Sequence, residues 1–178
     1  MTIAAELEAV FHDCFLSDFQ TRVQGGANEP LYRPDSAGES ALIMYREDFA
    51  ASLLHEVAHW CIAGVRRRRL EDYGYWYEPD GRDASRQSDF ERVEARPQAL
   101  EWHFSLACKL PFRVSLDNLG GEAGCGKSFS AAVAAEARRL CREPLPPRGE
   151  RFRRALAQRF GGNPRPVEAL FADGDADR

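Results

Sequence analysis

The sequence predicts a single α+β domain in which a metal-binding helix packs on a small sheet. The first observation is residues 52–64, where apolar residues recur at helical spacing beside the pattern H-E-x-x-H. The second is a short apolar run at residues 41–45, bounded by polar residues as a strand is. The third is a length of 178 residues with 44% hydrophobic content, which suits one domain over residues 1–178.

The N-terminal part is predicted to form one helix and an ordered loop before the strand. Residues 4–23 carry apolar side chains three and four positions apart, and residues 25–30 contain the glycines and proline that end such a helix. Residues 31–40 hold several turn formers and are expected to be a loop. The run at 41–45 is then a buried or edge strand that leads into the metal helix. His12, on the first helix, is expected to be a surface or partly packed histidine rather than a ligand.

The H-E-x-x-H pattern is the strongest chemical signal in the chain. Residues four apart on an α-helix lie on one face, so the imidazoles of His55 and His59 can converge on one metal ion, with Glu56 beside them. This is a zincin-like arrangement of metal ligands. We expect Asp48 at the start of the helix, as N-cap or first-turn acid, and Gly64 at its end. The alternative is a pair of core histidines satisfied by local hydrogen bonds.

The C-terminal half is predicted to be mainly helical. Residues 88–109 form a second long helix, in which Pro97 either kinks the helix or opens a new one. Residues 112–116 alternate like a strand, and residues 120–128 are expected to be a flexible loop, because their glycines lack phosphate-loop spacing. The remaining elements are helices at 129–141 and 150–160, a linker at 144–147 and a frayed end at 173–178.

Two imidazoles leave a metal site short of a ligand, and a carboxylate is the usual completion. Glu91, Glu94 and Glu101 are three and seven residues apart and therefore lie on one side of the helix predicted at residues 88–109. We prefer Glu94, because the small Ala95 beside it allows a close approach to the metal helix. Glu91 is the alternative ligand, and a solvated charge pattern is the alternative interpretation of all three acids.

Four consecutive arginines, Arg66, Arg67, Arg68 and Arg69, follow the metal helix. Cations at the C-terminal end of a helix interact favourably with its dipole, which explains some of them. A dense cationic cluster in an acidic chain is equally well interpreted as a docking patch for an acidic partner. Both interpretations stay open on the sequence.

An aromatic segment at residues 72–83 is predicted to be a strand or hairpin arm followed by a tight turn. Aromatic residues beside a metal cleft can form the wall that holds a substrate's alkyl chain, and charged residues in the turn can orient a charged substrate. The candidate substrate-binding residues are Tyr73, Tyr75, Trp76, Tyr77, Asp80, Arg82 and Asp83. The alternatives are core packing for the rings and a turn held by its own side chains.

Composition excludes several classes of function. A net charge of -4 argues against nucleic-acid binding, which normally needs a basic surface. The five cysteines include no C-x-x-C pair, which argues against a disulfide framework and a thiolate zinc site and fits the reducing cytoplasm. No apolar run reaches membrane-spanning length, and residues 1–8 carry acids where a signal peptide has basic residues. We therefore expect a cytoplasmic protein without nucleic-acid or membrane partners.

Two histidines and one carboxylate leave coordination positions open, which is typical of a catalytic metal. With zinc, Glu56 would be a general base that activates water, as in a metallopeptidase. With iron(II), the same ligand set forms the facial triad of oxygen-activating enzymes, although the order of ligands in the sequence differs from the usual one. Spacing alone does not choose the metal. A metal-free protein-binding module is the alternative that is not an enzyme.

Longer motifs resemble a known family. They are HEVAHWCIAG at 55–64, DYGYWY at 72–77, PDGRD at 79–83, VEARPQAL at 93–100 and NEPLY at 28–32. These motifs are similar to those of the bacterial elongation factor P hydroxylase family, with the densest match over residues 45–118. The resemblance is weaker after residue 119.

The resemblance implies hydroxylation of a lysine of elongation factor P that already carries a β-lysyl group. It also implies iron(II), with zinc as a possible occupant of purified protein, and O2 as co-substrate. The implied iron ligands are His55, His59 and a downstream glutamate, assigned to Glu94. Glu56 would then handle protons, the acids at 80 and 83 would hold amino groups of the substrate, and residues 66–69 would meet elongation factor P.

Overall fold

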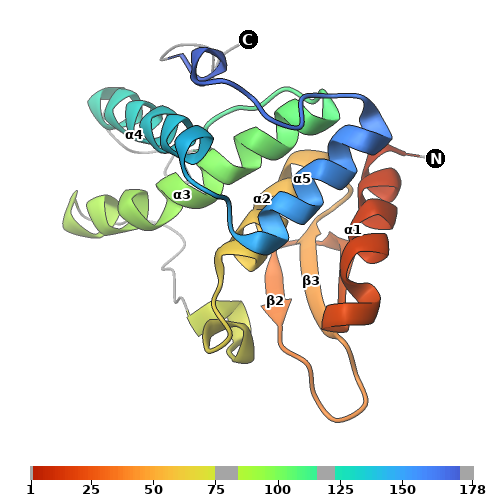
Figure 1. Ribbon diagram of the computed structural model, residues 1–178. Helices are drawn as coiled ribbons and strands as arrows, with labels where there is room; N and C mark the ends of the chain where they lie inside the picture. Colours follow the sequence, from red (N-terminus) through yellow and green to blue (C-terminus); the bar gives the residue numbers. More distant parts are fainter. Residues whose placement is uncertain (1, 75–83, 116–122, 173–178) are drawn as a thin grey trace.

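The computed structural model of the chain describes residues 2–74, 84–115 and 123–172, and all of their side chains except those of residues 84–92 and 123–126. The fold is α+β, with five helices and one small sheet in this part of the chain (Figure 1). The elements are α1 (Ile3–Phe19), β1 (Thr21–Ala27), β2 (Leu31–Arg33), β3 (Ala41–Arg46), α2 (Ala50–Ile62), α3 (Ala84–Cys108), α4 (Ala123–Arg142) and α5 (Pro147–Phe160), with 3₁₀ turns η1 (Arg67–Arg69), η2 (Glu71–Gly74) and η3 (Glu168–Leu170).

The sheet has the strand order β1-β3-β2, so the predicted strand at 41–45 is confirmed and is the central one. β1 pairs with β3 in parallel, with Val23 opposite Ile43, and β2 pairs with β3 antiparallel, with Tyr32 opposite Ile43. Ala41, Ile43 and Tyr45 are buried, as alternation along a strand requires. The buried face of β3 therefore points toward the helices, and the strand leads into α2.

Two expectations for the N-terminal third were wrong. The first helix ends at Phe19, where Gln20 adopts a left-handed conformation, and Thr21 and Val23 belong to a strand instead. The loop expected at 31–40 begins with the short strand β2. Both strands depend on pairing with β3, a long-range interaction that the local apolar spacing does not report. His12 is half-buried, as expected, and its Nε2 accepts a hydrogen bond from the Val23 N–H at 3.1 Å.

Helix α2 is held at the centre of the molecule by its apolar face, and it packs against β3, α1, α3 and α5 (Figure 1). The Trp60 ring lies 5.4, 4.9 and 5.5 Å from the rings of Phe11, Phe15 and Phe19, respectively. Arg148 of α5 stacks on Trp60 at 4.8 Å and donates hydrogen bonds to carbonyls in the last turn of α2 and just after it. These contacts fix the C-terminal end of the helix that carries the histidines.

The start of α2 differs from the prediction. Phe49 occupies the N-cap position with no side-chain cap, and Asp48 precedes it. Phe49 is also 47% exposed, so it does not belong to the buried apolar face of α2. The hydroxyl of Ser52 accepts a hydrogen bond from the Arg46 N–H at 3.0 Å, which joins the end of β3 to the first turn of α2.

The C-terminal half is helical, as predicted, with different bounds. Helix α3 runs without a break through Pro97, and α4 begins at Ala123, inside the segment expected to be a loop. Residues 112–115 form no strand, and residues 71–74 form a 3₁₀ turn instead of a strand or hairpin arm. The hairpin turn at 79–81 and the frayed end at 173–178 lie outside the described residues. In the described part of the chain, none of the helices combines the length and apolar character needed to cross a membrane.

His103 is completely buried where α3 meets α4 and α5. Its Nε2–H donates to the carbonyl of Ala137 at 3.0 Å, and its Nδ1 accepts from the Arg153 guanidinium at 3.2 Å. Burial lowers the pKa of His103 from 6.5 to about 4, and the nearby Arg153 acts in the same direction. The folded protein therefore keeps this imidazole neutral at pH values where the unfolded chain protonates it.

We expect the free energy of unfolding to fall as the pH drops from 6.5 to 4, because the unfolded chain binds one more proton at His103 in that window. The loss from this residue is about 3 kcal/mol. His103→Gln keeps a donor and an acceptor without a titrating group, so its stability should depend less on pH. Denaturant unfolding of both proteins across this range measures the difference. Equal slopes would contradict the assignment.

Candidate metal centre

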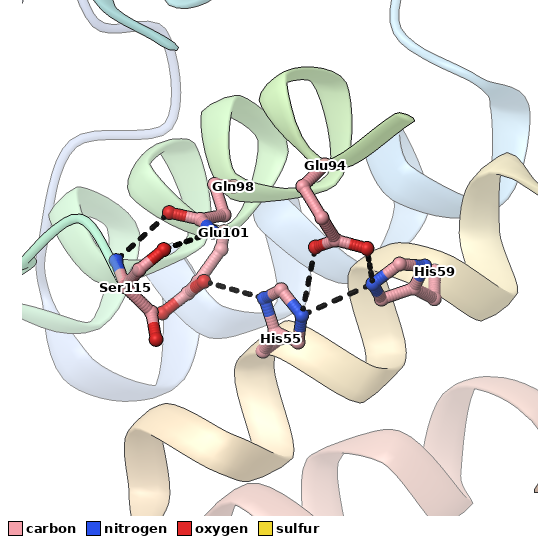
Figure 2. A network of polar contacts seen from close by, with 6 residues as sticks. All are labelled: His55, His59, Glu94, Gln98, Glu101 and Ser115. Atoms are coloured by element: carbon pink, nitrogen blue, oxygen red, sulfur yellow. Dashed lines mark hydrogen bonds and ion pairs between the residues drawn. The ribbon is translucent and has the colours of Figure 1, made fainter. Parts of the chain in front are cut away.

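Helices α2 and α3 pack against each other and bring three predicted ligand residues together (Figure 2). His55 and His59 lie one turn apart on α2, and the Glu94 carboxylate faces them from α3. Each offers one donor atom, and the three donor atoms lie within 4.8 Å of one another. The H-E-x-x-H helix is thus placed as the sequence predicted, and metal binding by these residues stays a prediction.

The spacing of the donor atoms fits a single ion. The His55 and His59 Nε2 atoms are 3.0 Å apart. Glu94 Oε2 lies 3.3 Å from His55 Nε2, and Glu94 Oε1 lies 3.4 Å from His59 Nε2. Ligands held about 2.1 Å from one metal at roughly tetrahedral or right angles are ~3.0–3.4 Å from each other. Two imidazoles and one carboxylate are also a donor set suited to zinc or iron(II). The residues present can therefore hold such an ion.

Glu101 fixes the orientation of His55. One of its carboxylate oxygens lies 2.9 Å from His55 Nδ1, so Nδ1–H donates to Glu101 and Nε2 faces His59 and Glu94 (Figure 2). Such a partner sets the tautomer and ring orientation of a metal-binding histidine. The sequence placed Glu101 on the same side of the helix as Glu94 without giving it a role. Their separation of seven residues, two helical turns, is the signal that points to this pairing.

Gln98 lies between these two acids on α3 and holds the chain that follows the helix. Its amide donates to the Ser115 carbonyl at 2.9 Å and accepts from the Ser115 N–H at 3.0 Å (Figure 2). This pair of hydrogen bonds takes the place of the strand expected at residues 112–116. It ties the returning chain to the helix face that carries Glu94 and Glu101.

The electrostatics of the cluster favour a cation between the carboxylates. Burial opposes protonation of His55, but hydrogen bonds to Glu101 and Glu94 raise its pKa well above the ordinary value. Burial likewise opposes ionisation of Glu94, but the charges of His59 and His55 lower its pKa. Burial raises the pKa of Glu101, against the effect of His55. The carboxylates of Glu94 and Glu101 thus create a negative potential at His55 that stabilises a proton there and would also stabilise a metal ion.

Glu56, the predicted catalytic residue, is half-buried on α2 between the two histidines in sequence. Burial raises the pKa of its carboxyl group, and the charges of His55 and His59 oppose that rise. Glu56 thus lies near enough to His55 and His59 for their charges to affect its pKa. Its role in catalysis stays a prediction.

Tyr73 is placed beside the site. Its ring stacks on Tyr32, with ring centroids 4.4 Å apart, and lies parallel to the His59 ring at 6.3 Å. A cavity of about 350 Å³ opens here, lined by His59, Ile62, Ala63, Gly64, Arg67, Tyr73, Val93, Arg96 and Pro97. The other candidate substrate residues, Tyr75, Trp76, Tyr77, Asp80, Arg82 and Asp83, and the side chain of Glu91 lie outside what the structure describes.

The arginine cluster divides into two parts. Arg68 donates to the carbonyl of Ala63 at 2.8 Å and lies over the Trp60 ring, as the helix-end interpretation requires. Arg67 donates to the carbonyl of Tyr73 at 3.1 Å. Arg66, Arg67 and Arg69 are all exposed, but Arg67 also bonds to the backbone, so a docking surface would consist mainly of Arg66 and Arg69.

The chain can be compared with known proteins at this point. A family model described as elongation factor P hydroxylase matches residues 10–170. The elongation factor P lysine hydroxylase of Haemophilus influenzae is 44% identical over 153 residues, which cover 85% of this chain and 85% of that protein. His55, His59, Glu94 and Glu101 all lie within the residues matched by the family model. The chain therefore belongs to the elongation factor P hydroxylase family.

Proposed function

We propose that this chain is a metal-dependent hydroxylase that modifies a lysine of elongation factor P. The observation that carries the proposal is the triad of His55, His59 and Glu94 in a member of this family. Its relative from Haemophilus influenzae is named for hydroxylating a lysine of that factor. The finer proposal is a non-haem iron monooxygenase, an oxidoreductase, that acts on the β-lysylated lysine in the cytoplasm with O2 as co-substrate.

The donor set supports iron(II), because two histidines and a carboxylate are the ligands of the facial triad. When bound there, the metal would supply the activation of O2 at its open coordination positions. His55, His59 and Glu94 would hold it, and Glu101 would keep His55 Nε2 turned toward it. Glu56 would hold or move a proton at the edge of the site.

The substrate side chain is long and cationic, and the proposed cleft suits it. Tyr73, which lines the cavity beside His59, would form one wall together with Tyr75 and Trp76. Asp80 and Asp83 would bind the amino groups of the substrate, and Arg82 would help to orient the charged substrate. The exposed Arg66 and Arg69, together with Arg67 and Arg68 between them, would meet acidic groups of elongation factor P.

We expect wild-type protein prepared without oxygen to contain stoichiometric iron, and His59→Ala and Glu94→Ala to lose it, because each removes one of three ligands. Metal analysis measures this. Glu91→Ala is the matched control, since it removes an acid from the same helix, and it should keep its iron. Iron retained in Glu94→Ala and lost in Glu91→Ala would move the third ligand to Glu91.

The same proteins test the reaction. Intact mass analysis of β-lysylated elongation factor P should show the gain of one oxygen atom with wild type and no gain with either ligand variant. Zinc in the protein and cleavage of a peptide, with no mass gain, would favour a metallopeptidase. Full function in His55→Ala and no bound metal would favour a protein-binding module.

Glu101→Leu should weaken metal binding about 10- to 100-fold, because His55 loses the acceptor that fixes its tautomer. Glu101→Gln keeps an acceptor without the charge and should fall between wild type and Glu101→Leu. Competition with a chelator measures the affinities. Glu143→Gln, which changes an exposed partner of Arg139, is the control and should bind metal like wild type. Wild-type affinity in Glu101→Leu would show that the pairing does not support the metal.

Reversing the charge of Arg66 and Arg69 together should raise the KM for elongation factor P and reduce the dependence of this KM on salt, since neither side chain would then attract an acidic partner. Arg67 and Arg68 are left unchanged, because their guanidinium groups bond to the backbone. Arg165→Glu, an exposed site on the segment after α5, is the control for a charge reversal away from this surface. An unchanged KM with unchanged salt dependence would refute docking at this surface.

A further inference from the structure

The hydroxyl group of Tyr73 is buried without a hydrogen-bond partner among the described residues. The residue is only 4% exposed. A buried hydroxyl that bonds to nothing is costly, so such a group in a folded protein requires an explanation. The neighbouring Tyr32 differs in this respect, because its hydroxyl donates to the carbonyl of Arg68 at 2.8 Å. Of two stacked rings, one therefore has a hydrogen-bonded hydroxyl, and the other has a hydroxyl with no partner in the part of the chain that the structure describes.

The backbone holds Tyr73 in an unfavourable conformation. Asp72 and Tyr73 have φ values of 45° and 58°, and Gly74 follows with 73°. Residues with a β-carbon rarely adopt this region, and such strain is concentrated at functional sites. The segment is kept in place by the Asp72 carboxylate, which accepts from the Tyr32 N–H at 2.7 Å, and by Arg67, which donates to the Tyr73 carbonyl. The position of the Tyr73 ring is thus set by several contacts at once.

Tyr73 borders the cavity beside the candidate metal centre. Tyr73 and the candidate metal ligand His59 line the same cavity of about 350 Å³. Burial, followed by the charge of Glu56, raises the pKa of Tyr73 well above its ordinary value, so the phenol keeps its proton and remains a donor. Three other buried polar atoms of described residues lack a partner, on Trp60, Arg148 and Arg153, and none of these residues lines this cavity.

We propose that the Tyr73 hydroxyl is a substrate-binding group that donates a hydrogen bond to an oxygen acceptor of the side chain that enters this cavity. The proposal rests on the proposed function, which identifies the acceptor. A β-lysylated lysine carries ammonium groups, which only donate, and one amide carbonyl, which accepts. The phenol O–H complements that carbonyl alone. Tyr73 thereby favours β-lysylated over unmodified elongation factor P.

Stability tests whether the hydroxyl is unsatisfied in the free protein. Tyr73→Phe removes only the oxygen and keeps the stacked ring, so the melting temperature of the substrate-free protein should rise by about 2–4 °C. Tyr32→Phe is the matched control. It removes a bonded hydroxyl from the other ring of the stack and should lower the melting temperature. A fall in both variants would show that the Tyr73 hydroxyl already has a partner, and would overturn the inference.

Kinetics tests what the hydroxyl binds. With β-lysylated elongation factor P, Tyr73→Phe should lower kcat/KM about tenfold, mainly through KM, because the carbonyl loses its donor. Unmodified elongation factor P lacks that carbonyl, so wild type and Tyr73→Phe should bind it with equal affinity. Equal kinetics of wild type and Tyr73→Phe on the β-lysylated substrate would overturn the inference and leave the hydroxylase standing. A wild-type protein that hydroxylates neither form would refute the proposed function itself.

Discussion

The packing of α2 against α3 is the constraint on which the site depends. It buries two carboxylates against two imidazoles, and such charges are tolerated in an interior only when they are paired. Glu94 and Glu101 are two turns apart on α3 and reach different nitrogens of His55. One acid therefore shares the central space with both histidines, while the other holds the ring of one histidine from behind. The arrangement is favourable for a cation and unfavourable for an empty, fully ionised cluster.

The rest of the fold keeps α2 in position for this contact. Phenylalanines of α1 surround Trp60, and Arg148 of α5 stacks on the same ring while bonding to carbonyls at the end of the helix. At the other end, β3 leads directly into α2, and the Ser52 hydroxyl in the first turn of α2 accepts a hydrogen bond from the N–H of Arg46, the last residue of β3. A helix held at both ends can present its histidines with little freedom, which is what pre-organised metal ligands require.

Beside the candidate metal centre, the chain after α2 contains residues that support the fold and residues with a proposed role in substrate binding. Arg68 and Tyr32 bond to the backbone and stabilise the segment, whereas the hydroxyl of Tyr73 has no partner among the described residues and lies at a cavity. The exposed Arg66 and Arg69 lie close by in sequence. Under the proposed function, docking of elongation factor P and insertion of its modified side chain would involve neighbouring parts of one segment.

The sequence by itself determined the elements whose signal is local. The H-E-x-x-H helix, the strand at 41–45 and the long helices follow from periodicity and from turn residues. Helical spacing placed Glu94 and Glu101 on one side of a helix, and the small Ala95 favoured Glu94 as the ligand. Only the tertiary structure decided that residues 21–27 and 31–33 are strands, because their hydrogen-bond partners lie in β3. It alone separated the roles of Glu94 and Glu101, which have the same chemistry and the same helix face. It alone also showed that the Tyr73 hydroxyl is buried with no partner among the described residues, since burial and pairing depend on residues distant in the chain.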